Sequence, residues 1–108
     1  SFNSFLAEDG NIYQATQNGL LGSHILKIGQ NNEYDNSYVF SLDAALGVTG
    51  TYVDAWRYVG NGIGYIAYSI ADKGGYIARI DLNARTASKV PIPDDADLSF
   101  GQDQGFDY

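Results

Sequence analysis

Apolar residues alternate with polar or small residues along most of this chain, which is the two-residue period of β-strands. In one run Ile66, Tyr68 and Ile70 share a face, whereas Tyr65 and Ala67 share the opposite face. Because both faces carry apolar side chains, the pattern predicts a sheet that is covered on both sides.

Turn residues divide the alternating runs into two sets of four predicted strands. In the first set the strands are Ser4–Ala7, Asn11–Gln17, His24–Gly29 and Tyr38–Leu42, and in the second they are Tyr52–Val59, Ile63–Ile70, Tyr76–Leu82 and Ser88–Ile92. Glycine and asparagine at positions 60–62 and 73–75 favour tight hairpin turns. Pro91 and Pro93 place the last strand at a sheet edge, because proline cannot donate a ladder hydrogen bond.

The two sets resemble two copies of one unit. Ser23–Ile28 has the same pattern as Gly75–Ile80, which lies 52 residues further along the chain. A period near fifty residues that contains only strands is typical of β-propeller blades. We therefore predict an all-β chain with one blade over residues 1–48, a second over 49–97 and the start of a third over 98–108, which together form a partial ring.

Composition agrees with a folded all-β protein and excludes several functions. Of the 108 residues, 44% are hydrophobic and 13 are glycine, as expected for short strands joined by turns. A net charge of −7 opposes binding to nucleic acid. No apolar run approaches the roughly 20 residues that span a bilayer. Because the chain does not begin with Met and its third blade is incomplete, we expect a segment of a longer protein.

Three segments carry a resemblance to a known family: Tyr52–Gly62, Gly75–Asn83 and Leu98–Phe106. Here the chain resembles the β-propeller lipoproteins of Bacteroidetes, which are often found with TonB-dependent outer-membrane receptors. Some of them capture iron-loaded siderophores made by other bacteria. The resemblance implies an outer-membrane lipoprotein of the cell envelope that binds a small molecule such as a ferric siderophore. The lipid-carrying cysteine of that family is absent from these residues.

Trp56, Arg57 and Tyr58 form the cluster best suited to a ligand. Together they offer a large π face, a fixed positive charge and a phenol, which suit a flat aromatic or anionic ligand. The alternative is that Trp56 and Tyr58 pack between neighbouring blades and that Arg57 pairs with a nearby carboxylate. The repeat supports this alternative, because it places Phe5 at the position equivalent to Trp56.

Gln102 and Gln104 are the second pair of predicted ligand contacts. They lie in a glycine-bounded segment where the third blade begins, and loops at such places commonly carry function. Their amides could hydrogen-bond a polar ligand or satisfy backbone groups at the mouth of the central channel.

No catalytic residue, metal site or cofactor is predicted. His24 is the only histidine and aligns with Tyr76 in the repeat, so we expect it to serve packing. Without cysteine, one histidine cannot build a zinc site. The acidic residues at 94–97 lack the glycine and glutamate of a calcium loop. No Gly-x-Ser-x-Gly segment is present.

The leading hypothesis from the sequence is a non-enzymatic propeller that captures an iron–siderophore complex or similar nutrient beside an outer-membrane receptor. Two alternatives stay open. The complete propeller could be an enzyme whose active site lies on blades outside this chain. Alternatively, two blades could be a complete unit whose copies assemble into a ring, as in small lectins.

Overall fold

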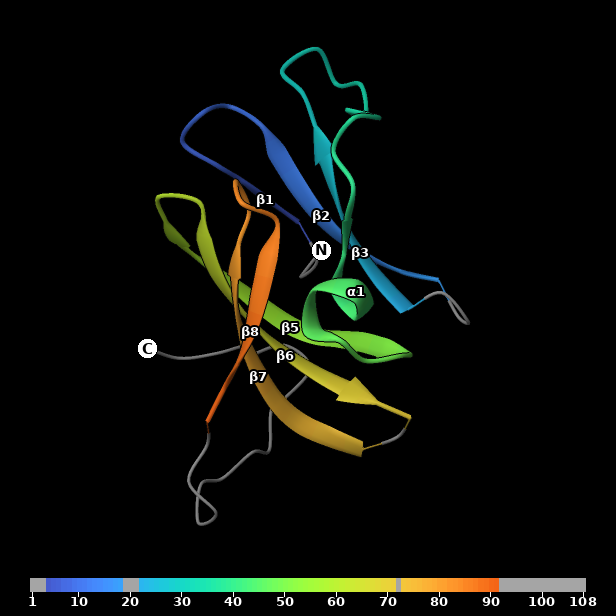
Figure 1. The fold of residues 1–108 in the computed structure, drawn as a ribbon. Coiled ribbons are helices and arrows are strands. Elements are labelled where there is room, and N and C mark those ends of the chain that lie inside the picture. The colour runs from blue at the N-terminus through green and yellow to red at the C-terminus, as the bar shows by residue number, and fades with distance from the viewer. Residues whose placement is uncertain (1–3, 19–21, 72, 92–108) are drawn as a thin grey trace.

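The protein is an all-β chain with a single short helix in the part that the structure describes, as shown in a computed structural model (Figure 1). The described residues are 4–18, 22–71 and 73–91. They form two four-stranded antiparallel sheets, and each sheet is built from strands in their order along the chain. The predicted all-β class and the division into two sets of four strands are thereby confirmed.

The first sheet contains four strands: β1 (Ser4–Leu6), β2 (Ile12–Asn18), β3 (Gly22–Ile28) and β4 (Phe40–Ser41). The second contains β5 (Thr51–Gly60), β6 (Ile63–Ile70), β7 (Lys73–Asp81) and β8 (Thr86–Val90). The predicted hairpin at residues 60–62 is confirmed, because Asn61 and Gly62 adopt φ values of 57° and 78°. As predicted, the last strand lies at a sheet edge, although β8 ends at Val90, before Pro91.

The fourth predicted strand, Tyr38–Leu42, is mostly wrong. Only Phe40 and Ser41 pair with β3, and the helix α1 (Leu42–Leu46) begins at the next residue. The side chain of Ser41 accepts a hydrogen bond of 3.2 Å from the backbone N–H of Ala44, which caps the helix start. Gly47 ends the helix with a φ of 69°.

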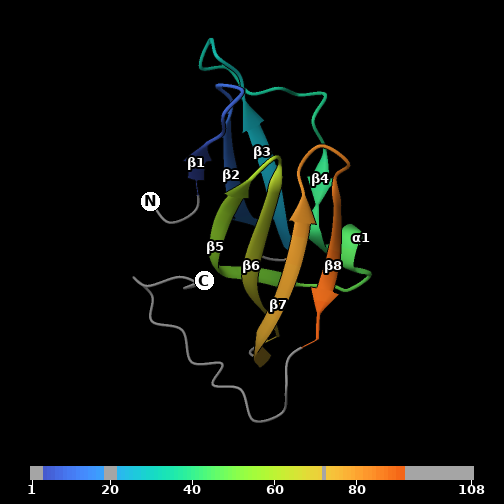
Figure 2. The ribbon, with the colours of Figure 1, turned by 90° about the vertical axis from the view of Figure 1, so that its left-hand side faces the viewer.

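A hydrophobic core fills the space between the two sheets. Its fully buried side chains come from both, with Ile25 on β3 and Ile66 and Ile80 on β6 and β7. Figure 2 views the molecule with the second sheet in front of the first. The face of Ile66, Tyr68, Ala78 and Ile80 is therefore the one turned toward the first sheet, and Ile66 and Tyr68 share a face as the alternation predicted.

The opposite face of the second sheet holds a smaller cluster. Ala55 and Ala67 are buried there, and Tyr65 and Ile77 pack against them. A register shift between Val53 and Ala55 changes the phase of β5. The shift allows Val53 and Trp56 to face the core although three positions separate them. We call the face that carries Ala55 and Ala67 the outer face of the second sheet.

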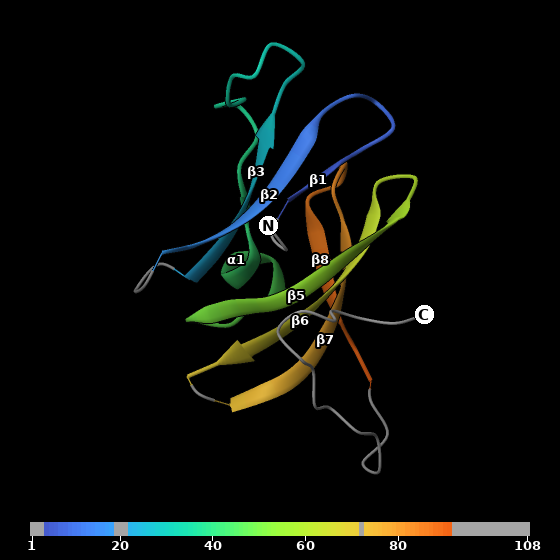
Figure 3. The same ribbon diagram turned by 180° about the vertical axis from the view of Figure 1, so that it is seen from behind.

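Helix α1 and a buried polar network join the two sheets. Figures 1 and 3, which show opposite sides, both place α1 between β3 and β8, and the helix contacts both strands. Ser23 Oγ on β3 donates to the carbonyl of Thr51 on β5 at 2.9 Å, and Thr51 Oγ1 accepts from the N–H of Ser23 at 3.2 Å. Thr51 in turn donates to the carboxylate of Asp43 on α1.

Candidate functional site

Trp56, the first predicted ligand contact, lies in the core between the sheets. Its side chain is 9% exposed and its ring centroid is 4.6 Å from that of Phe5 on β1. Phe5 also stacks on Tyr58, with centroids 4.4 Å apart and planes 12° from parallel. Phe5 and Trp56, which the repeat aligned, therefore pack against each other between the two sheets. This arrangement agrees with the alternative that Trp56 and Tyr58 serve packing.

Tyr58 carries a polar contact between the sheets at its hydroxyl. The hydroxyl donates to a carboxylate oxygen of Glu8, which follows β1, and accepts from the N–H of Gly62 at 2.9 Å. The second Glu8 oxygen accepts from the N–H of Asn61 at 3.3 Å. These hydrogen bonds, first of all that from Tyr58, hold the pKa of Glu8 below its usual range.

Arg57 lies on the outer face of the second sheet, away from Trp56 and Tyr58. It is exposed and pairs in register with Tyr65, which pairs with Arg79 on the next strand. The structure therefore does not bring the three predicted contacts together, because successive strand residues point to opposite faces. It places a cation, a phenol and a second cation in one row instead. Gln102 and Gln104 lie outside the described residues.

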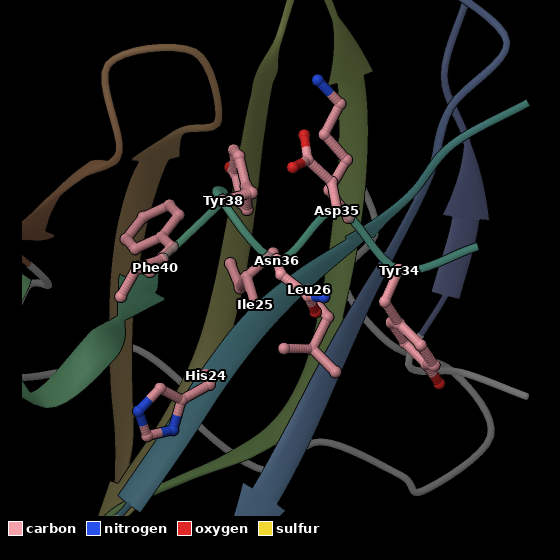
Figure 4. A pocket seen from close by; sticks show the side chains of 10 residues that line it. His24, Ile25, Leu26, Tyr34, Asp35, Asn36, Tyr38 and Phe40 are labelled. Carbon is pink, nitrogen blue, oxygen red and sulfur yellow. The ribbon is translucent and has the colours of Figure 1, made fainter.

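His24 lines a hollow on the first sheet. The hollow has a volume of about 350 Å³ and lies between β3 and residues 34–40. Figure 4 shows His24 and Leu26 projecting from the same side of β3. The other residues that line the hollow are mainly apolar or aromatic. They include Tyr34 and Val39, which are 57% and 68% exposed.

Two further hollows lie at one end of both sheets, which we call the turn end. It carries the β1–β2, β3–β4, β5–β6 and β7–β8 connections, since alternate connections of a meander fall at the same end. One hollow, of about 230 Å³, is lined by Ala7, Glu8, Asp9, Tyr13, Tyr58, Asn61, Gly62 and Asn83. The other has a similar volume and is lined by Tyr13, Lys27, Asp35, Ser37, Tyr38, Leu82, Asn83 and Arg85. Tyr13 and Asn83 line both.

The second turn-end hollow is built around the ring of Tyr38. The Tyr38 hydroxyl donates to the carbonyl of Leu82 at 2.6 Å, which ties the first sheet to the β7–β8 turn. Lys27 Nζ and Arg85 Cζ lie 5.8 and 5.7 Å from the centre of the same ring. Burial raises the pKa of Tyr38, so the phenol stays neutral and both cations face an uncharged π surface.

No motif in the sequence pointed to a site at this end of the molecule. Its residues come from four separate turns, and Glu8 and Asn61 are 53 positions apart. The only local signal was turn chemistry: Asp9 accepts from the N–H of Asn11, and Asp81 accepts from the N–H groups of Asn83 and Ala84. Such turns are common at surfaces, and only the packing of the sheets brings them together.

Comparison with known proteins found no matching family model, curated protein or solved structure. Within residues 4–18, 22–71 and 73–91, no group of three or more His, Cys, Asp or Glu side chains is placed to hold a metal ion. In the same ranges no helix has the length and apolar character needed to cross a membrane.

Proposed function

We propose that the two sheets are neighbouring blades of a β-propeller that binds a small-molecule ligand without chemical conversion. The observation that carries the proposal is the equivalence of the two sheets. Each is a four-stranded meander, and they pack face to face through aromatic residues at equivalent positions, Phe5 and Trp56. Hollows lined by tyrosine, asparagine and charged side chains at the turn end favour binding.

The apolar side chains on the outer faces support a larger ring. Leu6 is 68% exposed and Tyr52 is 54% exposed, at the two open flanks of the pair of sheets. Ile12, paired in register with Leu6, extends the apolar surface of the first sheet. Burial of such surface is worth about 25 cal/mol per Å², so further blades covering these faces would be stabilised.

The ligand class and the location follow from the family resemblance. We propose a ferric siderophore or a similar nutrient complex as the ligand, at the bacterial cell envelope beside a TonB-dependent receptor. The row of Arg57, Tyr65 and Arg79 supports an anionic aromatic ligand, because guanidinium groups and a phenol ring suit charge-assisted hydrogen bonds and stacking.

Calorimetric titration with ferric catecholate and ferric hydroxamate complexes tests this function. We expect saturable binding of the catecholate, and about tenfold weaker binding for Arg57→Ala, since one charge-assisted hydrogen bond contributes about 1.5 kcal/mol. Lys73→Ala, which removes one exposed cation elsewhere on the second sheet, is the control and should bind normally. Absence of binding for both complexes would remove this ligand class. If Arg57→Ala binds the complex as tightly as the wild type, the row of Arg57, Tyr65 and Arg79 is not the binding site.

A second candidate is a two-blade unit that closes a ring with copies of itself, and the exposed Leu6 favours it. If it holds, sedimentation velocity should show a trimer or tetramer, and Leu6→Lys should shift the protein toward monomer. Ala44→Lys, which adds the same charge at an exposed position of α1, should leave the assembly intact. A monomer at all concentrations would exclude self-assembly. Further blades of a longer chain would then be the elements that cover the exposed apolar faces.

A further inference from the structure

Tyr13 lines both turn-end hollows, and its hydroxyl has no hydrogen-bond partner in the part of the chain that the structure describes. The Tyr13 side chain is 3% exposed, with its ring 5.7 Å from those of Phe5 and Tyr38. Within the described residues its hydroxyl makes no hydrogen bond, although every side-chain N or O atom there that is sealed from solvent has a partner. The Tyr13 hydroxyl is therefore not sealed from solvent, and Tyr13 lines both turn-end hollows.

The two hollows that meet at Tyr13 carry opposite charge. One holds the carboxylates of Glu8 and Asp9 and no cation among its described lining residues. The other holds Lys27 and Arg85 with one carboxylate, Asp35. Both carboxylates of the first hollow are ionised at neutral pH. Their pKa values are lowered mainly by hydrogen bonds, from Tyr58 to Glu8 and from the Asn11 N–H to Asp9. Lys27 also lowers the pKa of Asp9, so the two poles are close enough to interact.

Asn83 provides a second polar group between the two poles. Gly62 has a φ of 78°, and a methyl group there would lie 2.4 Å from Asn83 Nδ2. The glycine therefore allows the Asn83 amide to lie against the β5–β6 turn, where it lines both hollows. The phenol of Tyr13 and the amide of Asn83 can hydrogen-bond a peptide group. The negative hollow on one side suits a peptide's ammonium terminus, and the positive hollow on the other side suits its carboxylate terminus.

We propose that the turn end binds a small zwitterion of the amino-acid or short-peptide class, with its ammonium group at Glu8 and Asp9 and its carboxylate at Lys27 and Arg85. The Tyr13 hydroxyl and the Asn83 amide hydrogen-bond the group between them. This site is separate from the row of Arg57, Tyr65 and Arg79. It depends neither on ring closure nor on the ferric ligand, because all of its residues lie on the strands of the two described sheets or in the turns that join them.

Triglycine is the probe, in calorimetric titrations at low salt. We expect saturable binding of triglycine, and at least tenfold weaker binding for N-acetyl-triglycine and for triglycine amide, which each lack one terminal charge. Equal binding of the blocked peptides, or no binding of triglycine, would overturn the proposal. Preferential binding of a neutral disaccharide would also overturn it, in favour of a carbohydrate site.

Tyr13→Phe separates binding from folding. Since the hydroxyl has no hydrogen-bond partner among residues 4–18, 22–71 and 73–91, its removal should leave the melting temperature unchanged while triglycine binds about tenfold more weakly. Tyr34→Phe is the matched control, because Tyr34 is exposed, lines the hollow beside β3 and lines neither turn-end hollow. Tyr38→Phe should lower the melting temperature by losing the bond to Leu82. Unchanged triglycine affinity in Tyr13→Phe would overturn the role of this hydroxyl.

Discussion

Replacing Ile66 by alanine is expected to lower the free energy of unfolding by about 2–5 kcal/mol, the range for deleting a buried aliphatic side chain and leaving a cavity. Ile66 is 0% exposed and lies on the central part of β6, in register with Trp56 and Ala78. Its side chain is part of the core shared by both sheets. Chemical denaturation followed by the fluorescence of Trp56 measures the loss.

Ile77→Ala is the matched control for this prediction. Ile77 lies on the adjacent strand but points to the outer face, where it is only partly buried. The same change of side chain should therefore cost about 1 kcal/mol or less. Equal losses for Ile66→Ala and Ile77→Ala would contradict the assignment of the main core to the space between the sheets.

Replacing Asp43 by asparagine is expected to cost about 1.5–3 kcal/mol, because its carboxylate accepts hydrogen bonds from three donors. These are the Gly50 N–H at 2.7 Å, the Thr51 N–H at 3.0 Å and the Thr51 hydroxyl. An asparagine would present an amide N–H₂ group to at least one of these donors. The loss extends to Ser23, since Thr51 is the residue through which Asp43 is connected to β3.

The contribution of Asp43 should depend on pH in one direction. Burial raises its pKa, but the hydrogen bonds from Thr51 and Gly50 outweigh burial and bring the pKa below the ordinary value of 3.8. A carboxyl with a lowered pKa in the folded state stabilises the protein above its unfolded pKa. This stabilisation is lost as the pH falls through the folded pKa. The stability difference between wild type and Asp43→Asn should therefore be constant near neutrality and shrink below about pH 4.

Asp54→Asn is the control for this pH dependence. Burial raises the pKa of Asp54, and a hydrogen bond with Ser69 only partly offsets that effect. Its contribution therefore has the opposite sign and declines as the pH rises. Asp54→Asn should not destabilise the protein at neutral pH. A large loss for Asp54→Asn, or none for Asp43→Asn, would contradict the hydrogen-bond network described between α1 and the sheets.

Most strands were predictable from sequence because local pattern and turn chemistry agree. Ile63–Ile70 is identical in prediction and structure, since alternation and the turn at residues 60–62 both define its start. Helix α1 was missed although Ser41 and Gly47 are good capping residues. Five helical residues are too few to show a helical period, and the predicted strand Tyr38–Leu42 ended at the first residue of the helix.

The candidate site was less predictable than the strands. Trp56, Arg57 and Tyr58 are adjacent in sequence, and the pleat separates them onto two faces. The register shift in β5 also decides which face receives Trp56, and no simple alternation predicts it. Tyr13 was not predicted as a site residue, because aromatic residues are common on strands. Only the fold shows that Phe5 and Tyr38 pack against its ring and that its hydroxyl has no hydrogen-bond partner among the described residues.

The strand order described above has a consequence for how the chain folds. Every strand pairs only with its neighbour along the chain, so each sheet can grow by successive hairpins that close over short stretches. Contacts of high sequence separation, such as Phe5 with Trp56 or Tyr38 with Leu82, form only when the sheets dock. We therefore expect most of the entropy cost of long-range closure to fall on the docking of the two sheets.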